Sequence, residues 1–281
     1  FWEKAKQNPR ILGDFVWAGM DYIGETGDGA AEYSDYKEEN PACRMTGGNG
    51  RVDLLGKPRA EAAFTRVAFE REKGPLIAVN PVYQKEKLNL TGWQLTKALE
   101  SWSWHGCQGQ TATVEVYARA AEVELLVNGQ AVGRKSYKNT CRRVFKTKYE
   151  DGEITAVSYD SMGRIIGRRT LKTAGEDIRL RICPEQQEVK PGKLVFIPLQ
   201  YTDAEGIWKP MARERLKVSV ENGVLMGLGS ANAYVKGNYA QDTADTYYGE
   251  AMAVVRAGEA GVVTVTVEDS RGSHTAEVLC K

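Results

Sequence analysis

The chain has 281 residues, with 38 Lys and Arg against 37 Asp and Glu, so its formal net charge is +1. This balance argues against a nucleic-acid partner, because polyanion binders carry a basic excess or stripe. Hydrophobic residues make up 42% and charged residues 27%, a composition typical of folded globular chains. No apolar run approaches about 18 residues, so no membrane-spanning helix is expected. The length fits about two domains, or three if they are small β modules.

The sequence begins with Phe1 and shows no signal-peptide pattern, so we expect a piece of a longer protein. Its 5 Cys and 2 His are spread along the chain without a CxxC pair. A zinc site is therefore not expected. No other cofactor is expected either, because the sequence has no phosphate-binding glycine loop and no dinucleotide fingerprint. Reduced, buried thiols favour the cytoplasm, although an export signal could have stood before Phe1.

Residues 1–72 differ from the rest of the chain in their predicted secondary structure. An opening helix should end at Pro9, whose ring blocks helical continuation, and 11–17 reads as a short buried strand. A long irregular stretch follows over 24–56, of a kind that is usually functional or mobile. Pro58 should open a second helix, at an early position where proline is tolerated. Its apolar face repeats with helical spacing at Ala60, Ala63, Phe64, Val67 and Ala68.

From about residue 85 the apolar pattern changes to period two, which is typical of half-buried strands. Val123, Leu125 and Val127 share one face, and Asn128-Gly129 is a two-residue hairpin signal. Further strands are expected at 142–147, 153–159 and 164–171. We therefore expect an antiparallel β-sandwich over 73–175.

The last region, 176–281, shows short strands and frequent turns, as in an immunoglobulin-like sandwich. Proline cannot donate to a strand ladder, so Pro198 should place its strand at a sheet edge or a bulge. The expected fold class is mainly β, with two antiparallel, immunoglobulin-like sandwiches after the opening segment. Strands of the last region are expected at 194–201, 216–220, 251–256, 261–268 and 275–279.

The densest set of candidate site residues lies at 13–25. Trp17 stands at the end of the predicted strand, where a flat indole could stack on the apolar face of a sugar ring. Asp21 and Glu25 follow, and carboxylates can bind sugar hydroxyls. The alternative is that Trp17 is a core aromatic and that the two acids cap loops.

The segment around Trp17 resembles the last strand of the catalytic barrel in glycoside hydrolase family 2, which includes β-galactosidases, β-glucuronidases and β-mannosidases. The resemblance implies that 1–72 are the final strand–helix segment of a (β/α)8 barrel. It covers nearly the whole chain in the family's order. Its other motifs stand at 1–10, 50–58, 123–129, 156–160, 173–175, 219–223, 226–230 and 249–253.

The same resemblance bears on catalysis. Retaining glycosidases need two carboxylic acids about 5 Å apart, and in this family both are Glu on barrel strands expected upstream of Phe1. The chain should therefore be inactive alone. By resemblance, Trp17 would line the pocket for the sugar being cleaved, and Asp21 and Glu25 would support its rim. No catalytic role is assigned to Glu3, Asp14, Asp21 or Glu25.

The sugar class can be narrowed by one motif. β-Glucuronidases carry an Asn-x-Lys pair before the last barrel helix, because a cation must meet the substrate carboxylate. Here Asn49 is followed by Arg51 instead of Lys, in a register that does not match, so a neutral β-galactoside is the expected carbohydrate partner. A β-mannosidase or β-glucuronidase stays open. So does a carbohydrate-binding or structural protein that hydrolyses nothing.

Three other features have competing interpretations. Aromatic residues over 93–105 could form a sugar platform, but we expect them to seal the barrel against the sandwich. The loop with Asp242, Asp245, Tyr247 and Tyr248 is expected to bind neither sugar nor calcium. Basic residues on the predicted strands should form a solvated face, at Arg142, Arg143, Lys146, Lys148, Arg164, Arg168 and Arg169.

Association is expected for the opening segment, because Val16, Phe64 and Val67 would expose apolar surface if it stood alone. Residues 1–72 should pack against the sandwich, form a homo-oligomer, or belong to a longer chain.

Overall fold

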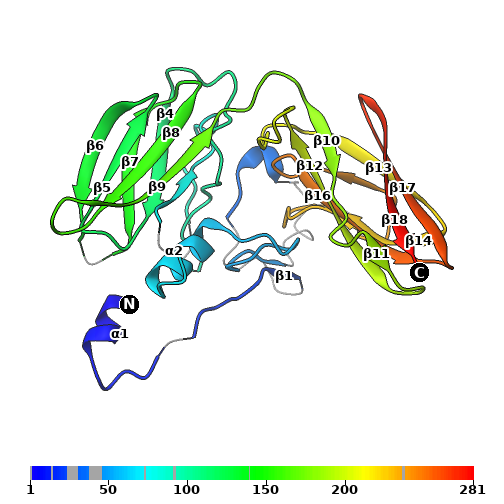
Figure 1. Ribbon diagram of the computed structural model, residues 1–281, viewed down its shortest axis with the longest axis horizontal. Coiled ribbons are helices and arrows are strands. Elements are labelled where there is room, and N and C mark those ends of the chain that lie inside the picture. Colours follow the sequence, from blue (N-terminus) through cyan, green and yellow to red (C-terminus); the bar gives the residue numbers. More distant parts are fainter. Residues whose placement is uncertain are drawn as a thin grey trace. The chain divides into compact units, whose positions relative to one another are not determined.

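The computed structural model is mainly β and divides into two compact units (Figure 1). The first unit comprises Phe1–Asp35 and Arg44–Thr173, and the second comprises Tyr36–Cys43 and Ala174–Lys281. No helix in the part of the chain described is long and apolar enough to cross a bilayer. The structure describes residues 2–13, 15–23, 31–37, 46–72, 74–90, 93–138, 140–235 and 238–281.

The first unit contains an antiparallel β-sandwich, with one sheet in the order β3-β4-β7 and the other in the order β6-β5-β8-β9. The predicted alternation is confirmed, since Val123, Leu125 and Val127 are buried. Asn128 and Gly129 make the predicted hairpin with φ angles of 49° and 78°. The strands are β3 (Leu76–Val79), β4 (Thr111–Tyr117), β5 (Glu122–Val127), β6 (Gln130–Ser136), β7 (Arg142–Lys148), β8 (Glu153–Tyr159) and β9 (Ile165–Lys172).

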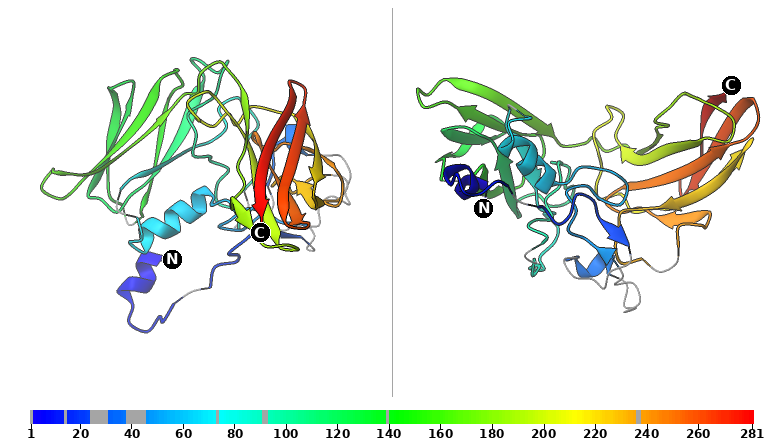
Figure 2. Two further views of the ribbon diagram at one scale, coloured as in Figure 1. Left: turned by 45° about the vertical axis from the view of Figure 1, so that its right-hand side comes forward. Right: turned by 90° about the horizontal axis from the view of Figure 1, so that it is seen from below.

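Helix α2 (Ala60–Ala68) lies against the three-stranded sheet of this unit (Figure 2). Its apolar face is the predicted one, and Val67 and Ala68 are buried against Leu76 of β3. The Phe64 ring meets the edge of the Tyr117 ring at 6.5 Å between centroids. This part of 1–72 therefore packs against the sandwich, as one of the three expected outcomes.

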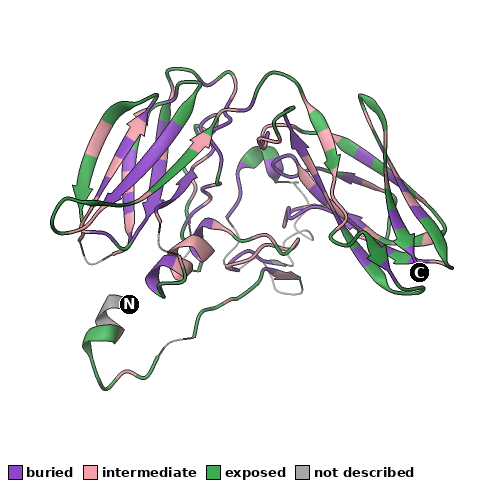
Figure 3. Ribbon diagram, in the orientation of Figure 1, coloured by how far each residue is buried: buried purple, intermediate pink, exposed green. Residues whose placement is uncertain are grey.

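The opening segment differs from its prediction. Helix α1 (Trp2–Gln7) ends before Pro9, as expected. The described residues of 11–17, however, form no strand and are mostly exposed (Figure 3). Leu12 and Phe15 are fully exposed. The buried strand is therefore wrong for this chain. A strand needs a neighbouring edge for its backbone groups, and none of the described strands lies beside 11–16.

The second unit is a larger sandwich, with sheets in the orders β10-β12-β16-β14 and β11-β18-β17-β13-β15. Inward residues of both sheets form one core, as in β17, where Val263, Val265 and Val267 are all buried. The five predicted strands are confirmed, and no end differs by more than three residues. The strands are β10 (Arg179–Ile182), β11 (Glu188–Val189), β12 (Leu194–Thr202), β13 (Arg215–Glu221), β14 (Gly223–Gly229), β15 (Thr243–Asp245), β16 (Glu250–Ala257), β17 (Gly261–Asp269) and β18 (Gly272–Cys280).

Pro198 does not lie on an edge strand, which corrects the prediction. Strand β12 is central, because it pairs with β10 on one side and β16 on the other. The Pro198 carbonyl accepts the Cys183 N–H at 2.9 Å, just beyond the end of β10 at Ile182. The nitrogen of Pro198 faces the same side. Its missing N–H therefore falls where the β10 ladder has already ended.

Tyr36 belongs to the second unit, although it stands far from it in the sequence. It ends the short 3-10 helix η1 (Ser34–Tyr36), and its ring centroid lies 4.8 Å from those of both Tyr247 and Tyr248. Asn232 donates to the Tyr36 carbonyl at 3.1 Å. The tyrosines of the predicted polar loop are thus part of a buried aromatic cluster.

A buried Asp and a buried Lys hold the start of the second unit. The Asp203 carboxylate accepts the N–H groups of Gly175 at 2.7 Å, Glu205 at 2.9 Å and Ile207 at 2.8 Å. The Lys209 ammonium donates to three successive carbonyls at 175–177. Burial alone would raise the pKa of Asp203, but the backbone donors and Lys209 outweigh it, so the pKa lies below its ordinary value.

This lowered pKa predicts an acid-sensitive second unit. A carboxylate with a depressed folded-state pKa stabilises the fold above its unfolded pKa, and that contribution is lost as pH falls through the folded one. We expect Asp203→Asn to lower the free energy of unfolding by about 1.5–3 kcal/mol at pH 7, and we expect this difference from the parent to shrink as pH falls below the ordinary Asp pKa of about 3.9. Urea denaturation across this pH range measures both effects.

The matched control is Asp245→Asn, because Asp245 is exposed and pairs with Arg215, which is also exposed. It should change stability by less than about 0.5 kcal/mol at any of these pH values. Equal losses in the two variants would contradict the role assigned to Asp203.

Candidate functional site

The segment that follows Trp17 is held by the chain at 46–52. Ala18 donates to the Asn49 carbonyl at 3.2 Å and accepts the Arg51 N–H at 3.0 Å. The Val52 N–H then reaches the Gly19 carbonyl at 3.0 Å. Beyond this ladder, β1 (Tyr22–Ile23) pairs antiparallel with β2 (Thr46–Gly47). Residues 18–23 and the part of the predicted irregular stretch at 46–52 therefore fix each other.

Trp17 presents its indole on the surface of this structure. The side chain is 60% exposed, so the core-aromatic alternative does not describe it in this chain. Its Nε1 donates to the Tyr22 hydroxyl at 2.9 Å, and the two rings are nearly perpendicular at 89°. The peptide bond between Trp17 and Ala18 is cis. The indole is thus both exposed and oriented, as a stacking surface for an apolar ring face requires.

Asp21 faces inward from the same segment and is 5% exposed. Its carboxylate accepts the Gly50 N–H at 2.7 Å and forms an ion pair with Arg59, whose Nη1 also donates to the Gly48 carbonyl at 3.1 Å. Burial raises the pKa of Asp21, and the Arg59 guanidinium and the Gly50 N–H oppose that rise. Asp21 therefore ties the loop at 48–50 to the residue before helix α2.

Gly50 stands where no side chain fits. A Cβ there would lie 2.1 Å from the Asp21 nitrogen and 2.4 Å from the Val52 oxygen, both backbone atoms. We expect Gly50→Ala to lower the free energy of unfolding by about 1–3 kcal/mol, because the two chain segments must separate. Gly19→Ala in the facing segment has open space around its new methyl group. It should cost less than about 0.5 kcal/mol by urea denaturation. Equal costs would contradict the close backbone approach.

A second buried ion pair interacts electrostatically with the pair formed by Asp21 and Arg59. Lys97 Nζ is 2.9 Å from Glu32 Oε2, and the two side chains are 11% and 1% exposed. Burial lowers the pKa of Lys97, while Glu32 and Asp21 raise it and Arg59 lowers it further. The other Glu32 oxygen accepts the Tyr33 N–H at 2.9 Å. Two acids and two bases therefore balance in this buried cluster.

A third charged group lies on the side of β4 that faces α2. The Glu115 carboxylate, which is 1% exposed, accepts two bonds from Arg142 at 2.9 and 2.7 Å. It also accepts from the Tyr117 hydroxyl, and from Thr96 Oγ1 at 2.8 Å. Glu61 on α2 accepts the Leu95 and Thr96 N–H groups, both at 3.2 Å. These contacts join α2 to the sheet.

The predicted solvated face is wrong at two positions. Arg142 is paired with Glu115, and Arg143 is 4% exposed because β7 turns it to the same face as buried Phe145. Its guanidinium donates to backbone carbonyls at 118, 120 and 141. The remaining five residues are exposed as predicted, at Lys146, Lys148, Arg164, Arg168 and Arg169.

The sugar-platform interpretation fails for two of the tryptophans. Trp102 and Trp104 are 0% exposed, whereas Trp93 is 56% exposed. Trp102 Nε1 donates to the Glu150 carbonyl at 3.0 Å, and its ring lies 4.8 Å from that of Tyr149. Trp102 and Trp104 therefore belong to the interior of the first unit.

The structure describes some of the candidate site residues and not others. Trp17 and Asp21 are brought together by 46–52, whereas Glu25 and Asp14 lie outside the described residues. Sequence reasoning missed Arg59, which pairs with Asp21, and Lys97, whose charge acts on Asp21. It also missed Glu32, which pairs with Lys97. No periodicity marks them, and the single available signal was a basic residue directly before a predicted helix. Within the described ranges no cluster of three or more potential metal ligands occurs.

Family models match both β regions of the chain. Residues 178–278 match the model described as glycoside hydrolase family 2 C-terminal domain 5, and residues 109–167 match a domain of unknown function, DUF4982. The chain is 28% identical over 259 residues to the β-galactosidase BoGH2A of Bacteroides ovatus, covering 90% of this chain and 26% of that protein. It is 22% identical over 299 residues to a putative β-glucuronidase of Formosa agariphila, covering 99% of this chain and 25% of that protein.

Solved structures show the same relationship. A glycosyl hydrolase family 2 member from Bacteroides cellulosilyticus is 25% identical, with a TM-score of 0.86 over 100% of this chain and 37% of its own. A β-glycosidase from Bacteroides vulgatus, 21% identical, shares the fold with a TM-score of 0.75, over 99% of this chain and 32% of its own. The chain thus spans about a quarter of the curated relatives and about a third of the solved ones.

Proposed function

Because this chain belongs to glycoside hydrolase family 2, as a C-terminal part, we propose that its complete polypeptide is a retaining β-glycosidase that hydrolyses terminal β-galactosides. The proposal assigns the chain a pocket tryptophan, Trp17, and two accessory β-sandwich domains. Residues 1–72 are proposed to be the end of the catalytic barrel, 73–175 the first sandwich domain and 176–281 the second.

The exposed, oriented indole of Trp17 is the observation that carries the carbohydrate assignment. An aromatic ring held by a hydrogen bond to Tyr22 can stack on a sugar without first losing its own rotational freedom. The exposed apolar side chains around it, Phe15, Val16 and Met20, are the surface that the rest of a barrel would cover. The β-galactoside is favoured because the relative that is 28% identical, over 90% of this chain, is a β-galactosidase.

The catalytic acids are proposed to lie outside this chain. Retention needs one carboxylic acid as acid/base and another as nucleophile, about 5 Å apart across the scissile bond. Asp21, the described acid nearest to Trp17 in sequence, is engaged with Arg59 and Gly50 and is not free to attack a sugar. We propose that Asp21 supports the rim of the pocket by holding this loop, and Glu25 is proposed to do so as well.

The test compares this chain with the complete polypeptide on chromogenic β-galactoside, β-glucuronide and β-mannoside. We expect hydrolysis of the β-galactoside by the complete polypeptide and none by the chain alone. Hydrolysis by the chain would contradict the placement of the catalytic pair. A complete polypeptide inactive on all three would favour a binding or structural role instead.

Trp17→Ala in the complete polypeptide tests the pocket residue. Losing the stacking surface should lower kcat/KM for the preferred substrate about tenfold to hundredfold. The control is Trp93→Ala, which removes a similarly exposed indole from the same unit. Equal activity in the two variants would contradict the role of Trp17.

A β-glucuronidase is the second candidate, and one contact favours it. The backbone groups of Asn49 and Arg51 flank Ala18, directly after Trp17, and Arg51 Nε has no hydrogen-bond partner in the described structure. A cation at this place could meet a uronate carboxylate. If the complete polypeptide prefers the β-glucuronide, Arg51→Ala should abolish that preference. If the β-galactoside is preferred, the same variant should leave the order of the substrates unchanged.

A further inference from the structure

A basic groove lies in the first unit, where the two sheets of its sandwich each end in an edge strand. Strand β6 is the edge of the four-stranded sheet, and β7 is the edge of the three-stranded one. The groove between them has a volume of about 480 Å³. Five of its eight lining residues are cations and none is an acid: Arg134, Lys135, Ser136, Lys138, Thr140, Arg142, Arg143 and Val144.

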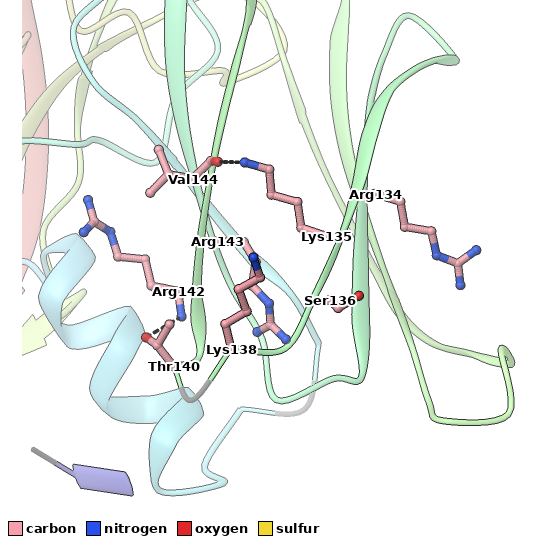
Figure 4. Close-up of a pocket in the computed structure, with 8 residues that line it drawn as sticks. All are labelled: Arg134, Lys135, Ser136, Lys138, Thr140, Arg142, Arg143 and Val144. Carbon is pink, nitrogen blue, oxygen red and sulfur yellow. Dashed lines mark hydrogen bonds between the residues drawn. The ribbon is translucent and has the colours of Figure 1, made fainter. Parts of the chain in front are cut away.

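The five cations fall into two groups. Arg134 pairs with Glu122 at 2.8 Å and Arg142 pairs with Glu115, and both point away from the space between the strands (Figure 4). Lys135, Lys138 and Arg143 point into that space (Figure 4). Lys135 crosses it to donate to the Val144 carbonyl on the free edge of β7. None of these three pairs with a carboxylate of the described residues.

Arg143 makes the groove more than a solvated surface. It is 4% exposed, its Nη atoms donate only to neutral carbonyls, and its Nε has no partner in the described structure. A guanidinium keeps its charge at neutral pH, and burying a charge without a counter-charge costs free energy. An anion beside Lys135 and Lys138 would provide the missing negative charge.

We propose that the β6–β7 groove binds the oxyanion group, carboxylate or sulfate ester, of an acidic oligosaccharide. Lys135, Lys138 and Arg143 are the cations that would bind the anion, because all three point into the space between the strands. The volume falls in the range of about 300–1,000 Å³ that small-molecule sites occupy. The saccharide carrier rests on the proposed function, because a carbohydrate-degrading protein meets anions on sugar chains. The groove would therefore hold substrate outside the catalytic pocket.

Isothermal titration of this chain tests the proposal with four probes: an oligogalacturonate, a sulfated galactan oligosaccharide, a neutral galactotriose and inorganic sulfate. We expect at least one acidic oligosaccharide to bind, with an affinity that falls as ionic strength rises, and galactotriose not to bind. The stronger of the two acidic probes identifies the anion. Equal binding of galactotriose would overturn the anion assignment. Inorganic sulfate binding as tightly as either acidic oligosaccharide would overturn the saccharide assignment.

The variant Lys135→Gln/Lys138→Gln removes two cations at the surface and spares buried Arg143. This variant should bind the acidic oligosaccharide at least about tenfold more weakly than the parent. Lys172→Gln is the control, because Lys172 is exposed on β9, at the opposite edge of the same sheet. Equal effects of the two variants, with melting curves that show both folded, would overturn the site. Binding is measured without hydrolysis, so failure here leaves the glycosidase proposal standing, and an inactive complete polypeptide leaves the binding result standing.

Discussion

Replacing Lys97 with alanine is expected to lower the free energy of unfolding of the first unit by about 3–5 kcal/mol. The substitution removes one partner of a buried ion pair, and Glu32, at 1% exposure, would lose the cation that lies 2.9 Å from its carboxylate. Asp21 and Arg59 would also lose the positive charge of Lys97, with which both interact electrostatically. Chemical denaturation followed by Trp fluorescence measures this loss of stability. The signal reports mainly on the first unit, because Trp208 is the single tryptophan of the second unit.

The double variant Glu32→Gln/Lys97→Met separates the pair from its individual charges. Replacing both charges with neutral groups of similar size leaves no unpaired ion, so a large part of the lost stability should return. Lys87→Ala, at an exposed position of the same unit, is the control and should change stability by less than about 0.5 kcal/mol. A double variant as unstable as Lys97→Ala would contradict the buried pair.

Trp102→Ala is expected to cost about 3–5 kcal/mol, the range for emptying a buried aromatic site. The side chain is 0% exposed, packs on Tyr149 and bonds the Glu150 carbonyl through Nε1. Its removal leaves both a cavity and a carbonyl without its donor. Thermal unfolding followed by far-UV circular dichroism measures the loss.

Trp93→Ala is the matched control, because Trp93 is 56% exposed in the same unit. It should cost about 1 kcal/mol or less. If the two substitutions cost the same, the interior position of Trp102 would be contradicted, and the aromatic residues of 93–105 would again have to be considered as a binding surface.

The two sandwiches could be predicted from sequence because their strands bury one face each. In β17, Val263, Val265 and Val267 alternate with polar residues, and that period by itself sets which side meets the core. Strand β3 was missed because all four of its residues are buried, so no alternation marks them. Strand β14 was missed because it carries three glycines and a register shift at Leu225/Gly227.

The candidate site could be predicted only in part. Trp17 and Asp21 were found because they stand close together in the sequence after an apolar run. Arg59, which pairs with Asp21, and Lys97, whose charge acts on it, come from segments up to 76 positions away and have no local pattern (Lys97 minus Asp21). Glu32 joins the cluster through its pair with Lys97. Buried ion pairs form between segments that only the complete fold brings together, so a single sequence does not show which charges will pair. The strand expected at 11–17 failed for the related reason that strand formation depends on a neighbour.

Tyr36 has a consequence for the order in which the chain folds. It contacts Asn232 and Tyr248 across 196 and 212 positions of sequence. Contacts of such separation form late, because a long loop must close before they contribute any stability. During synthesis, Tyr36 would emerge well before the loops at Asn232 and Tyr248 that it contacts. The second unit would therefore complete this aromatic cluster only after Tyr248 has been synthesised, and a fragment starting at Ala174 would lack the Tyr36 ring.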